Sequence, residues 1–331
     1  MIIEARAYAR AGLLGNPSDG YFGKTISIIV RNFGASISLY ETPELCIEEA
    51  EVDLNNFRNV YHLIDSVKLT GYYGGTRLIK AAIKTFIEYC EDNNISLTRK
   101  NFTIRYRSSI PRQVGLAGSS AIVTATMKAL MQFYAVDIPI HILPTIVLKA
   151  EAKELGINAG LQDRVIQAYE GCVFMDFNKE HLEKNGYGLY QSINSALLPR
   201  MYLAYKLELG KVSGVVLNNI REKYEKGDPL VLETLEQLGD LAEQGHKALL
   251  SCDYGLLNRL IDQNFDLRCK IMNISESNME LVQTARKCGA SAKFSGSGGA
   301  IIGMYDDDDM LHRLVVNLQK INARVIKPII M

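Results

Sequence analysis

The sequence predicts a mixed α/β (α+β) protein with two domains. Its 331 residues exceed the usual size of one hydrophobic core. Strand-like and helical stretches alternate up to about residue 195, whereas long amphipathic stretches dominate beyond it. Because 47% of the residues are apolar and 22% charged, both halves can bury a core. We therefore expect an N-terminal domain over 1–195 and a C-terminal domain over 196–331.

The first half opens with strands. Residues 24–40 are rich in β-branched and aromatic side chains, which predicts paired strands with a turn near 32–34. Apolar residues recur at helical spacing over 76–90. Residues 101–111 alternate as in a half-buried strand and lead into a loop at Pro111.

A buried helix is predicted next, over 119–135, since its apolar positions cover most of its circumference. A helix over 144–155, a helix-like run ending at Gly171 and the strand CVFMDF follow. The second half is predicted from these stretches: the strand MYLAYKLE, helices over 213–226, 230–250 and 254–271, a glycine turn feeding a strand over 292–304, a helix over 310–321 and the strand ARVIKPII.

Composition restricts the possible partners. Lysine plus arginine and aspartate plus glutamate both number 37, so no global field draws the chain to nucleic acid or to an anionic membrane. The six cysteines form no C-x-x-C pair, and the opening MIIEARAYARAGLLGN carries charges without an uninterrupted apolar run. We expect a cytoplasmic protein with small-molecule partners, and make no prediction of its oligomeric state.

The segment PRQVGLAGSSA, residues 111–121, is a glycine- and serine-rich loop between a predicted strand and a predicted apolar helix. The first N–H groups of a helix lack intrahelical partners and carry partial positive charge, so such a loop favours phosphate binding. It is not a Walker A loop, because it lacks the G-K-[ST] ending. A plain helix cap made by Ser119 or Ser120 is the alternative.

Two further segments carry candidate chemistry. A second glycine run, KFSGSGGA at 293–300, could share a phosphate site with the first loop or form an ordinary turn. Glu151 and Asp163 lie on either side of a glycine-containing turn; phosphoryl transfer needs one carboxylate for Mg²⁺ and another for the attacking hydroxyl. Alternatively, Glu151 lies on a solvated helix face and Asp163 at a helix N-terminus.

A polar segment near the start, Arg6 to Asp19, is rich in turn residues. Its Asn, Asp and Ser side chains could bind sugar hydroxyls, or N-P-S-D-G could simply form a turn. The acidic run Asp306 to Asp309 is predicted to be a solvated loop without function.

These four segments, in this order, resemble the GHMP kinase superfamily over nearly the whole chain. The resemblance implies that superfamily's fold, with an N-terminal domain like domain 2 of ribosomal protein S5 and a ferredoxin-like C-terminal domain. It also implies phosphoryl transfer from ATP with Mg²⁺. Within the superfamily, several stretches are most similar to glucuronokinases, which implies phosphorylation of the anomeric hydroxyl of D-glucuronate: RAYARAGLLGNPSDGYFGKTIS, GYYGG at 71–75, ELGINAGLQDRV and NFDLR at 264–268.

The resemblance also implies roles for individual residues. Asp163 corresponds to the catalytic aspartate and Arg10 to its basic companion, with Lys24 as a competing candidate. Ser120 and Glu151 correspond to the Mg²⁺ ligands. The implied nucleotide contacts are Pro111, Gly115, Leu116, Ala117, Gly118, Ser119, Ser120, Gly296, Ser297, Gly298 and Gly299, and the implied sugar contacts are Asn16, Asp19, Tyr21 and Asp163.

The sequence alone is also compatible with other functions. The same chemistry could act on galactose, galacturonate, a heptose phosphate or mevalonate, and the same fold could serve a catalytically silent sensor or a nucleotide-dependent decarboxylase. A sugar acid needs an additional cation for its carboxylate. Arg164, Arg200 and Arg268 are candidates for that cation, and an exposed or structurally paired arginine is the alternative for each.

Overall fold

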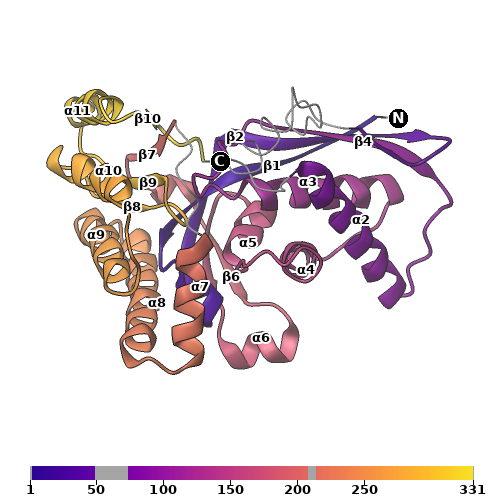
Figure 1. Cartoon of the computed structure of the whole chain (residues 1–331), viewed down its shortest axis with the longest axis horizontal. Helices are drawn as coiled ribbons and strands as arrows, with labels where there is room; N and C mark the ends of the chain where they lie inside the picture. Colours follow the sequence, from indigo (N-terminus) through magenta and orange to yellow (C-terminus); the bar gives the residue numbers. More distant parts are fainter. Residues whose placement is uncertain (1, 49–73, 208–213, 331) are drawn as a thin grey trace, which may run out of the picture.

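The computed structural model describes residues 2–48, 74–207 and 214–330, and shows two sheets with helices packed on them (Figure 1). The larger, six-stranded sheet has the order β3-β4-β2-β5-β6, with β1 paired to β2. Its strands pair antiparallel, except that β3 runs parallel to β4. Its strands are β1 (Ile2–Leu14), β2 (Lys24–Thr42), β3 (Cys46–Ile47), β4 (Asn101–Ser108), β5 (Cys172–Asp176) and β6 (Leu189–Ile193).

Helices cover one face of this sheet (Figure 1). Helices α3 and α5 pack directly on β1 and β2, while α2 and α4 pack against α3. The short helix η1 (Ser18–Tyr21) connects β1 to β2. The helices of this half are α2 (Gly75–Asp92), α3 (Gly118–Tyr134), α4 (Leu143–Ala152), α5 (Gln162–Tyr169) and α6 (Lys179–Asn185).

The smaller sheet is antiparallel and has the order β10-β7-β9-β8. Its first strand in sequence thus lies between the third and the fourth, as in a ferredoxin-like domain. Helices α8 and α9 pack together and also contact β1. The elements are β7 (Met201–Lys206), α7 (Gly214–Glu225), α8 (Pro229–Leu250), α9 (Tyr254–Ile271), α10 (Glu276–Lys287), β8 (Lys293–Phe294), β9 (Ala300–Met304), α11 (Asp308–Gln319) and β10 (Ala323–Ile326), with η3 (Ser195–Leu197) preceding them.

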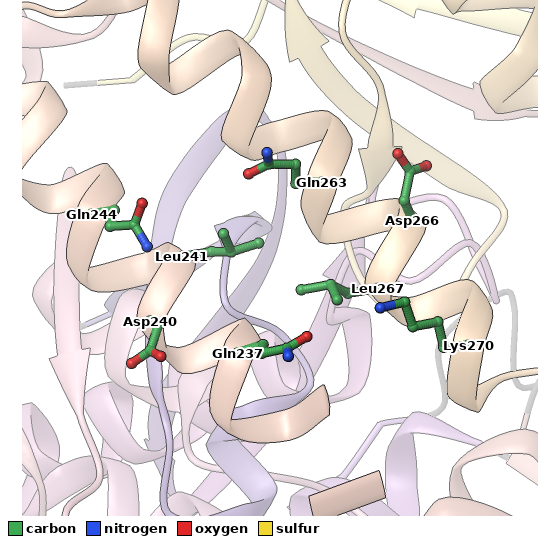
Figure 2. Close-up of a pocket in the computed structure, with 8 residues that line it drawn as sticks. All are labelled: Gln237, Asp240, Leu241, Gln244, Gln263, Asp266, Leu267 and Lys270. Carbon is green, nitrogen blue, oxygen red and sulfur yellow. The ribbon is translucent and has the colours of Figure 1, made fainter. Parts of the chain in front are cut away.

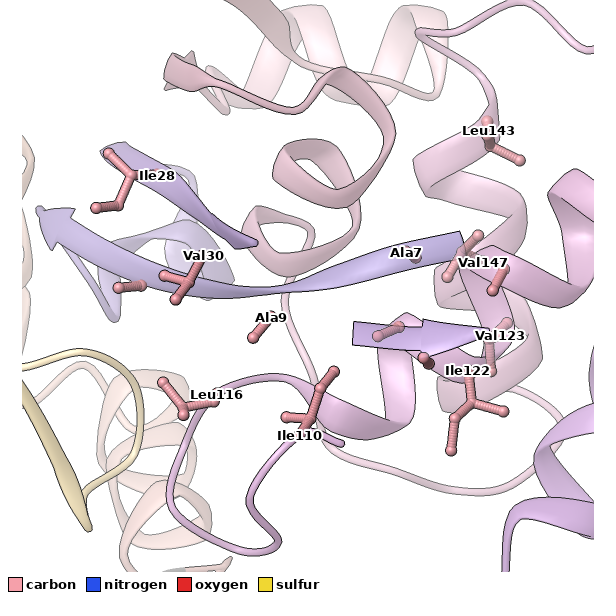
Figure 3. Close-up of a cluster of buried hydrophobic side chains, with 14 of the residues drawn as sticks. Ala7, Ala9, Ile28, Val30, Ile110, Leu116, Ile122, Val123, Leu143 and Val147 are labelled. Atoms are coloured by element: carbon pink, nitrogen blue, oxygen red, sulfur yellow. The ribbon is translucent and has the colours of Figure 1, made fainter. Parts of the chain in front are cut away.

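The main hydrophobic core is continuous between the two sheets. Figure 3 shows its centre, where the small side chains Ala7 and Ala9 of β1 allow α3, with Val123, to lie close to the strand. The same cluster reaches Leu203 of β7 and Ile302 of β9. We still propose a domain boundary after residue 195, since the strands of the larger sheet end at 193 and β7 begins at 201.

Most of the predicted elements are confirmed. The helices over 76–90, 119–135, 144–155 and 254–271 correspond to α2, α3, α4 and α9. The prediction missed the helices α6 and α10 and the short strands β3 and β6. The short α6 and β6 bury few side chains, and therefore show little of the periodicity on which the prediction depends.

Two predictions near the N-terminus are wrong. Residues 24–40 form one strand, β2, instead of two strands with a turn at 32–34; a register shift in the pairing with β1, between Tyr8 and Ala9, takes up the irregularity. Residues 6–14 belong to β1 and not to a polar turn. Alternating alanines face the core there, and such small residues give a weak hydrophobic signal.

The acidic run Asp306 to Asp309 is also not a simple loop. Asp307 caps α11 by accepting a hydrogen bond from the Met310 N–H (2.7 Å), and Asp308 and Asp309 form the first helical turn. Acids at this position are favoured by the helix dipole. Residues 71–73 of the GYYGG stretch lie outside the described residues.

Within the described ranges, no helix combines the length and the apolar character needed to cross a bilayer.

Gly303 of β9 lies very close to the backbone of Ser291, just before β8, and this contact gives a first testable prediction. A Cβ on Gly303 would overlap the carbonyl oxygen of Ser291, which is backbone and cannot rotate away. We expect Gly303→Ala to lower the free energy of unfolding by about 1–3 kcal/mol, the usual cost of overpacking. Gly255→Ala is the control, because its Cβ has ordinary contacts in a helix. Thermal denaturation measures both, and equal melting temperatures would contradict the prediction.

Candidate active site

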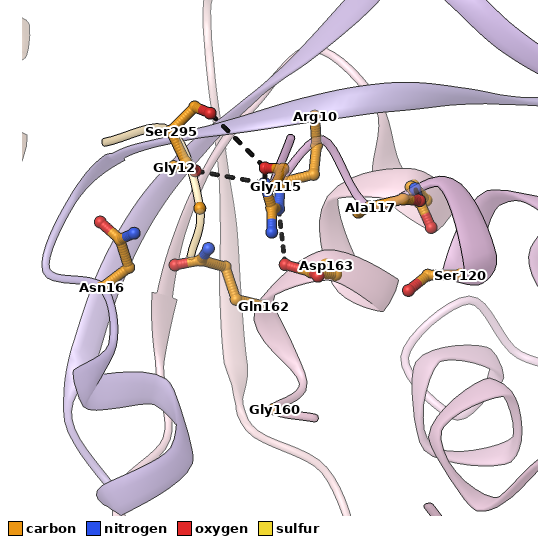
Figure 4. A network of polar contacts seen from close by, with 12 residues as sticks. Arg10, Gly12, Asn16, Gly115, Ala117, Ser120, Gly160, Gln162, Asp163 and Ser295 are labelled. Atoms are coloured by element: carbon orange, nitrogen blue, oxygen red, sulfur yellow. Dashed lines mark hydrogen bonds and ion pairs between the residues drawn. The ribbon is translucent and has the colours of Figure 1, made fainter. Parts of the chain in front are cut away.

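The centre of the site is an ion pair between β1 and α5. Arg10 Nε lies 2.6 Å from Asp163 Oδ1, and both side chains are largely covered. Arg10 Nη1 also donates to the carbonyl oxygens of Gly115 (2.6 Å) and Ser295 (3.1 Å) (Figure 4). One guanidinium therefore joins α5 to both glycine-rich loops.

Opposing effects act on the charge of Asp163. Burial by itself raises the pKa of this carboxyl, but the charges of Arg10 and Arg164 and hydrogen bonds from Arg10 and Gln162 outweigh it. The net pKa lies below the ordinary value, so Asp163 is ionised at neutral pH. An ionised carboxylate here can accept a hydrogen bond from a hydroxyl and hold its oxygen in place.

The two glycine-rich loops lie against each other, backbone to backbone. A Cβ on Gly115 (φ +72°) would be 2.9 Å from Gly298 O and 2.9 Å from Ser297 N, and a Cβ on Gly296 would overlap Gly115 O. Side chains at these positions would force the loops apart. The expectation that the two loops share one site is therefore supported by direct contact between them.

The start of α3 is suited to an anion. The helix begins at Gly118, after Ala117 in the left-handed conformation, and no side chain of the described residues caps it. Its first N–H groups are therefore available to a ligand. A Cβ on Gly118 would meet no atom closer than 3.5 Å. Pro111 lies in the loop that leads to this helix start.

Both serines at the start of α3 face one carboxylate. The hydroxyls of Ser119 and Ser120 lie 2.8 and 3.3 Å from Glu151 Oε1. The other carboxylate oxygen, Oε2, accepts from Arg164 Nε at 2.7 Å and from its Nη2. Glu151 is fully buried, so it does not lie on a solvated helix face.

This arrangement fits a magnesium ion bound mainly through phosphates. Glu151 Oε1 is free of Arg164 and lies beside the Ser120 hydroxyl, giving two hard oxygen ligands. No cluster of three or more His, Cys, Asp or Glu side chains was found in the described part of the chain. Mg²⁺ commonly binds through one or two carboxylates, substrate phosphates and water, so a full protein cage is not required.

A second carboxylate lies near the ion pair. Asp19 of η1 accepts a long hydrogen bond from the Gln162 N–H (3.4 Å), and Gly160 allows this approach because a Cβ there would overlap Asp19 Oδ2. Burial and the charge of Asp163 raise the pKa of Asp19 to about 6. Asn16 is buried nearby in the same loop.

The raised pKa of Asp19 gives a prediction for stability. The folded state holds the Asp19 proton up to about pH 6, whereas the unfolded state releases it near 3.8, so stability falls as pH rises through this window. We expect Asp19→Asn to remove this loss, which amounts to about 3 kcal/mol at pH 7. Urea unfolding at several pH values between 4 and 7 tests it. The prediction would be contradicted if the difference in unfolding free energy between the wild type and Asp19→Asn did not change with pH.

Several candidate residues do not face the ion pair. Tyr21 packs on Tyr224, with ring centroids 4.7 Å apart, and lines a groove with Phe22 and Gly239. The Leu116 side chain belongs to the core, so only its backbone can serve a ligand. Lys24 pairs with Glu243 of α8 at 2.5 Å, so of the two basic candidates it is Arg10, and not Lys24, that contacts Asp163.

The structure adds residues to which the sequence assigned no role. Lys293 is fully buried and donates to Gly12 O (2.7 Å), Asn16 Oδ1 (2.5 Å) and Phe294 O (2.9 Å). Gln162 is also buried, and its side-chain amide packs closely on Gly12. A Cβ added to Gly12 would lie only 3.1 Å from Gln162 Nε2. The position of Gln162 beside Asp163 in the sequence was the only available signal.

One cavity, of about 390 Å³, lies apart from these residues (Figure 2). It lies between α8 and α9 and includes none of the predicted site residues. Its lining is Gln237, Asp240, Leu241, Gln244, Gln263, Asp266, Leu267 and Lys270. With three glutamines and charges of both signs, it points to no particular chemistry.

Family models and known relatives match most of this chain. Residues 77–171 match the family model "GHMP kinases N terminal domain", and residues 246–321 match "GHMP kinases C terminal". Glucuronokinase 1 of Arabidopsis thaliana is 45% identical over 91% of this chain and 84% of its own length. Probable glucuronokinase 2 of the same plant is 46% identical over the same shares.

Solved structures show the same fold at low identity. Mevalonate kinase of Methanococcus jannaschii superposes with a TM-score of 0.71 and 21% identity, covering 100% of this chain and 98% of the other. Galactokinase of Lactococcus lactis, complexed with galactose, gives a TM-score of 0.77 at 13% identity, covering 99% and 93%.

The family models and the glucuronokinase relatives identify a kinase that transfers a phosphoryl group to an alcohol. The chain belongs to the GHMP kinase family, whose members use ATP as the phosphate donor. The predicted two-domain fold class is thereby confirmed.

Proposed function

We propose that this chain is an ATP-dependent sugar 1-kinase that phosphorylates the anomeric hydroxyl of D-glucuronate to give D-glucuronate 1-phosphate. The observation that carries the proposal is the Arg10–Asp163 pair placed against two touching glycine-rich loops. The choice of substrate rests on the glucuronokinases of Arabidopsis thaliana, at 45% and 46% identity over most of both chains.

We assign the donor side of the site to backbone and hydroxyl groups. The N–H groups at the start of α3, from Gly118 to Ser120, would receive phosphate oxygens, and residues 296–299 would close the site from the other loop. Ser120 and Glu151 would hold Mg²⁺, which supplies charge neutralisation at the phosphates when bound.

We assign the acceptor side to Asp163, Arg10, Asn16 and Asp19. Ionised Asp163 would accept a hydrogen bond from the attacking hydroxyl and align it for in-line transfer. Its lowered pKa makes it a weak base, so orientation is its main role. Arg10 would hold Asp163 in place and offset negative charge as the phosphoryl group moves.

The proposal includes a cytoplasmic location and, as partners, a sugar acid and ATP, without nucleic acid or membrane; it makes no statement on the oligomeric state. Other GHMP acceptors are the nearest alternative, and a catalytically silent sensor is the alternative from a different class. The presence of Ser120, Glu151 and Asp163 in one continuous site speaks against the sensor.

A substrate panel tests the proposal. Purified protein with MgATP is assayed for ADP release against glucuronate, galacturonate, glucose, galactose, arabinose and mevalonate. We expect the highest kcat/KM for glucuronate, with phosphate on the anomeric oxygen as shown by ³¹P NMR. Preference for another acceptor would move the substrate, and ATP binding without turnover on any acceptor would favour the sensor.

A further inference from the structure

One buried arginine near the proposed sugar site lacks a matching anion. Arg268 of α9 is 1% exposed, and its Nη2 donates to Gly296 O at 2.9 Å. Its Nε and Nη1 are buried and have no hydrogen-bond partner among the described residues. The guanidinium also lies 5.3 Å from the Phe294 ring centroid. Two unpaired donors on a buried cation are costly and indicate a missing acceptor.

The other two candidate arginines are already occupied. Arg164 is bound by Glu151 and by Gly160 O, which fixes it on the magnesium side of the site. Arg200 is exposed, and its Nη1 donates at 2.8 Å to the carbonyl oxygen of Asp306, which follows β9 in the chain. Arg268 alone of these three has free donors inside the molecule.

Arg268 belongs to a buried group of cations beside the sugar loop. Burial lowers the pKa of Lys293, which donates to Asn16, and the charges of Arg268 and Arg10 lower it further. The pKa of Arg268 itself is lowered to about 10, mainly by burial. The charge of Arg10 lowers this pKa further, and the charge of Asp19 opposes the shift. Arg10 is matched by Asp163, whereas no carboxylate of the described residues forms an ion pair with Arg268 or Lys293.

The face of α9 that carries Arg268 points toward the site. One turn earlier, Asn264 accepts from the Gly15 N–H at 2.7 Å and donates to Asn16 O at 3.4 Å. Gln263, Asp266 and Lys270 lie on the other side of this helix, at the cavity in Figure 2. The helix thus brings an unmatched cation to the loop that carries Asn16.

From this geometry we infer that Arg268 binds the carboxylate of a sugar acid and thereby selects uronic acids over neutral sugars. The inference rests on the proposed function, which it deepens by naming a specificity residue. The carboxylate would accept from Nε and Nη1, the planar pair that suits bidentate binding. Because Arg268 Nε and Nη1 are both buried, the carboxylate can reach them only if the segments around Asn16 and Gly296 move apart.

The test compares acceptors in Arg268→Met, with Arg200→Met as the matched control. The wild type and the control should keep the same ratio of kcat/KM for glucuronate to that for glucose. In Arg268→Met we expect this ratio to fall about 100-fold, through a higher KM for glucuronate, with kcat/KM for glucose unchanged. An unchanged ratio, or an equal rise in the KM for ATP with both acceptors, would overturn the inference.

Binding without turnover separates this inference from the proposed function. D-Glucuronate and D-galacturonate should raise the melting temperature of the wild type, glucose should raise it less, and Arg268→Met should lose the difference. If the wild type fails to phosphorylate glucuronate but shows this pattern, the proposed substrate is wrong and the role of Arg268 stands. If no uronic acid stabilises the wild type, the role of Arg268 is wrong.

Arg268→Lys guards against a folding defect. It keeps the buried charge but loses the planar pair of donors, so we expect an intermediate ratio and a folded protein. Circular dichroism and melting temperature report folding of each variant. A folded Arg268→Lys variant with the full wild-type ratio would contradict bidentate binding.

Discussion

Replacing Asp163 by asparagine is expected to lower kcat about a thousandfold, because the attacking hydroxyl loses the charged acceptor that orients it for in-line transfer. The amide keeps the shape of the carboxyl group but loses its charge, so it neither pairs with Arg10 nor fixes the hydroxyl with the same strength. The KM for ATP should change little, because we assign Asp163 to the acceptor side of the site. Steady-state ADP release at saturating glucuronate measures the effect.

Asp309→Asn is the matched control for this substitution. Asp309 is exposed in the first turn of α11 and should tolerate the same chemical change with full activity. The Asp163→Asn protein must also be shown to fold, because Arg10 is 5% exposed and loses its carboxylate partner. A folded Asp163→Asn variant that keeps more than a tenth of the wild-type kcat would remove Asp163 from the catalytic role.

The substitution Glu151→Gln should impair both stability and activity. It removes the main carboxylate partner of buried Arg164, which keeps only the longer contact of its Nη1 with Asp163 Oδ2 (3.5 Å), and breaking a buried ion pair usually costs about 3–5 kcal/mol of folding free energy. It also removes the carboxylate that lies beside the Ser120 hydroxyl, so the Mg²⁺ concentration for half-maximal activity should rise at least about tenfold. Chemical denaturation and a Mg²⁺ titration of activity measure the two effects.

A double variant separates the two roles of Glu151. Combining Glu151→Gln with Arg164→Met removes the unpaired charge, so most of the lost stability should return. Activity should not return with it, because the magnesium ligand is still missing. Recovery of activity together with stability would show that Glu151 acts only as the partner of Arg164.

Much of the fold could be predicted from sequence because its signals are local. The helices α2, α3 and α9 follow from apolar spacing within each segment, and both glycine-rich loops from their composition. The wrong predictions arose where a distant partner decides the structure. Residues 24–40 form one strand because β1 pairs along its length, and no feature within that segment shows this.

The candidate site divides in a similar way. The sequence, with its resemblance to a known family, predicted Arg10, Asp163, Glu151 and Ser120 as a set, and their roles remain proposals. It could not predict that Ser119 shares the carboxylate of Glu151, nor that Arg164 occupies its other oxygen. It could also not choose among Arg164, Arg200 and Arg268, because burial and hydrogen-bond partners separate them.

The sequence by itself determined the class of fold, the two glycine-rich loops and the residue types available for chemistry, because periodicity and glycine content act over a few residues. Tertiary structure alone decided which charges are paired and which are not. Arg10 reaches Asp163 across 153 positions and Lys293 reaches Asn16 across 277. Such contacts depend on how β1, α5, α9 and β8 pack around one core. The electrostatics of a buried side chain follow from those neighbours and not from its own segment.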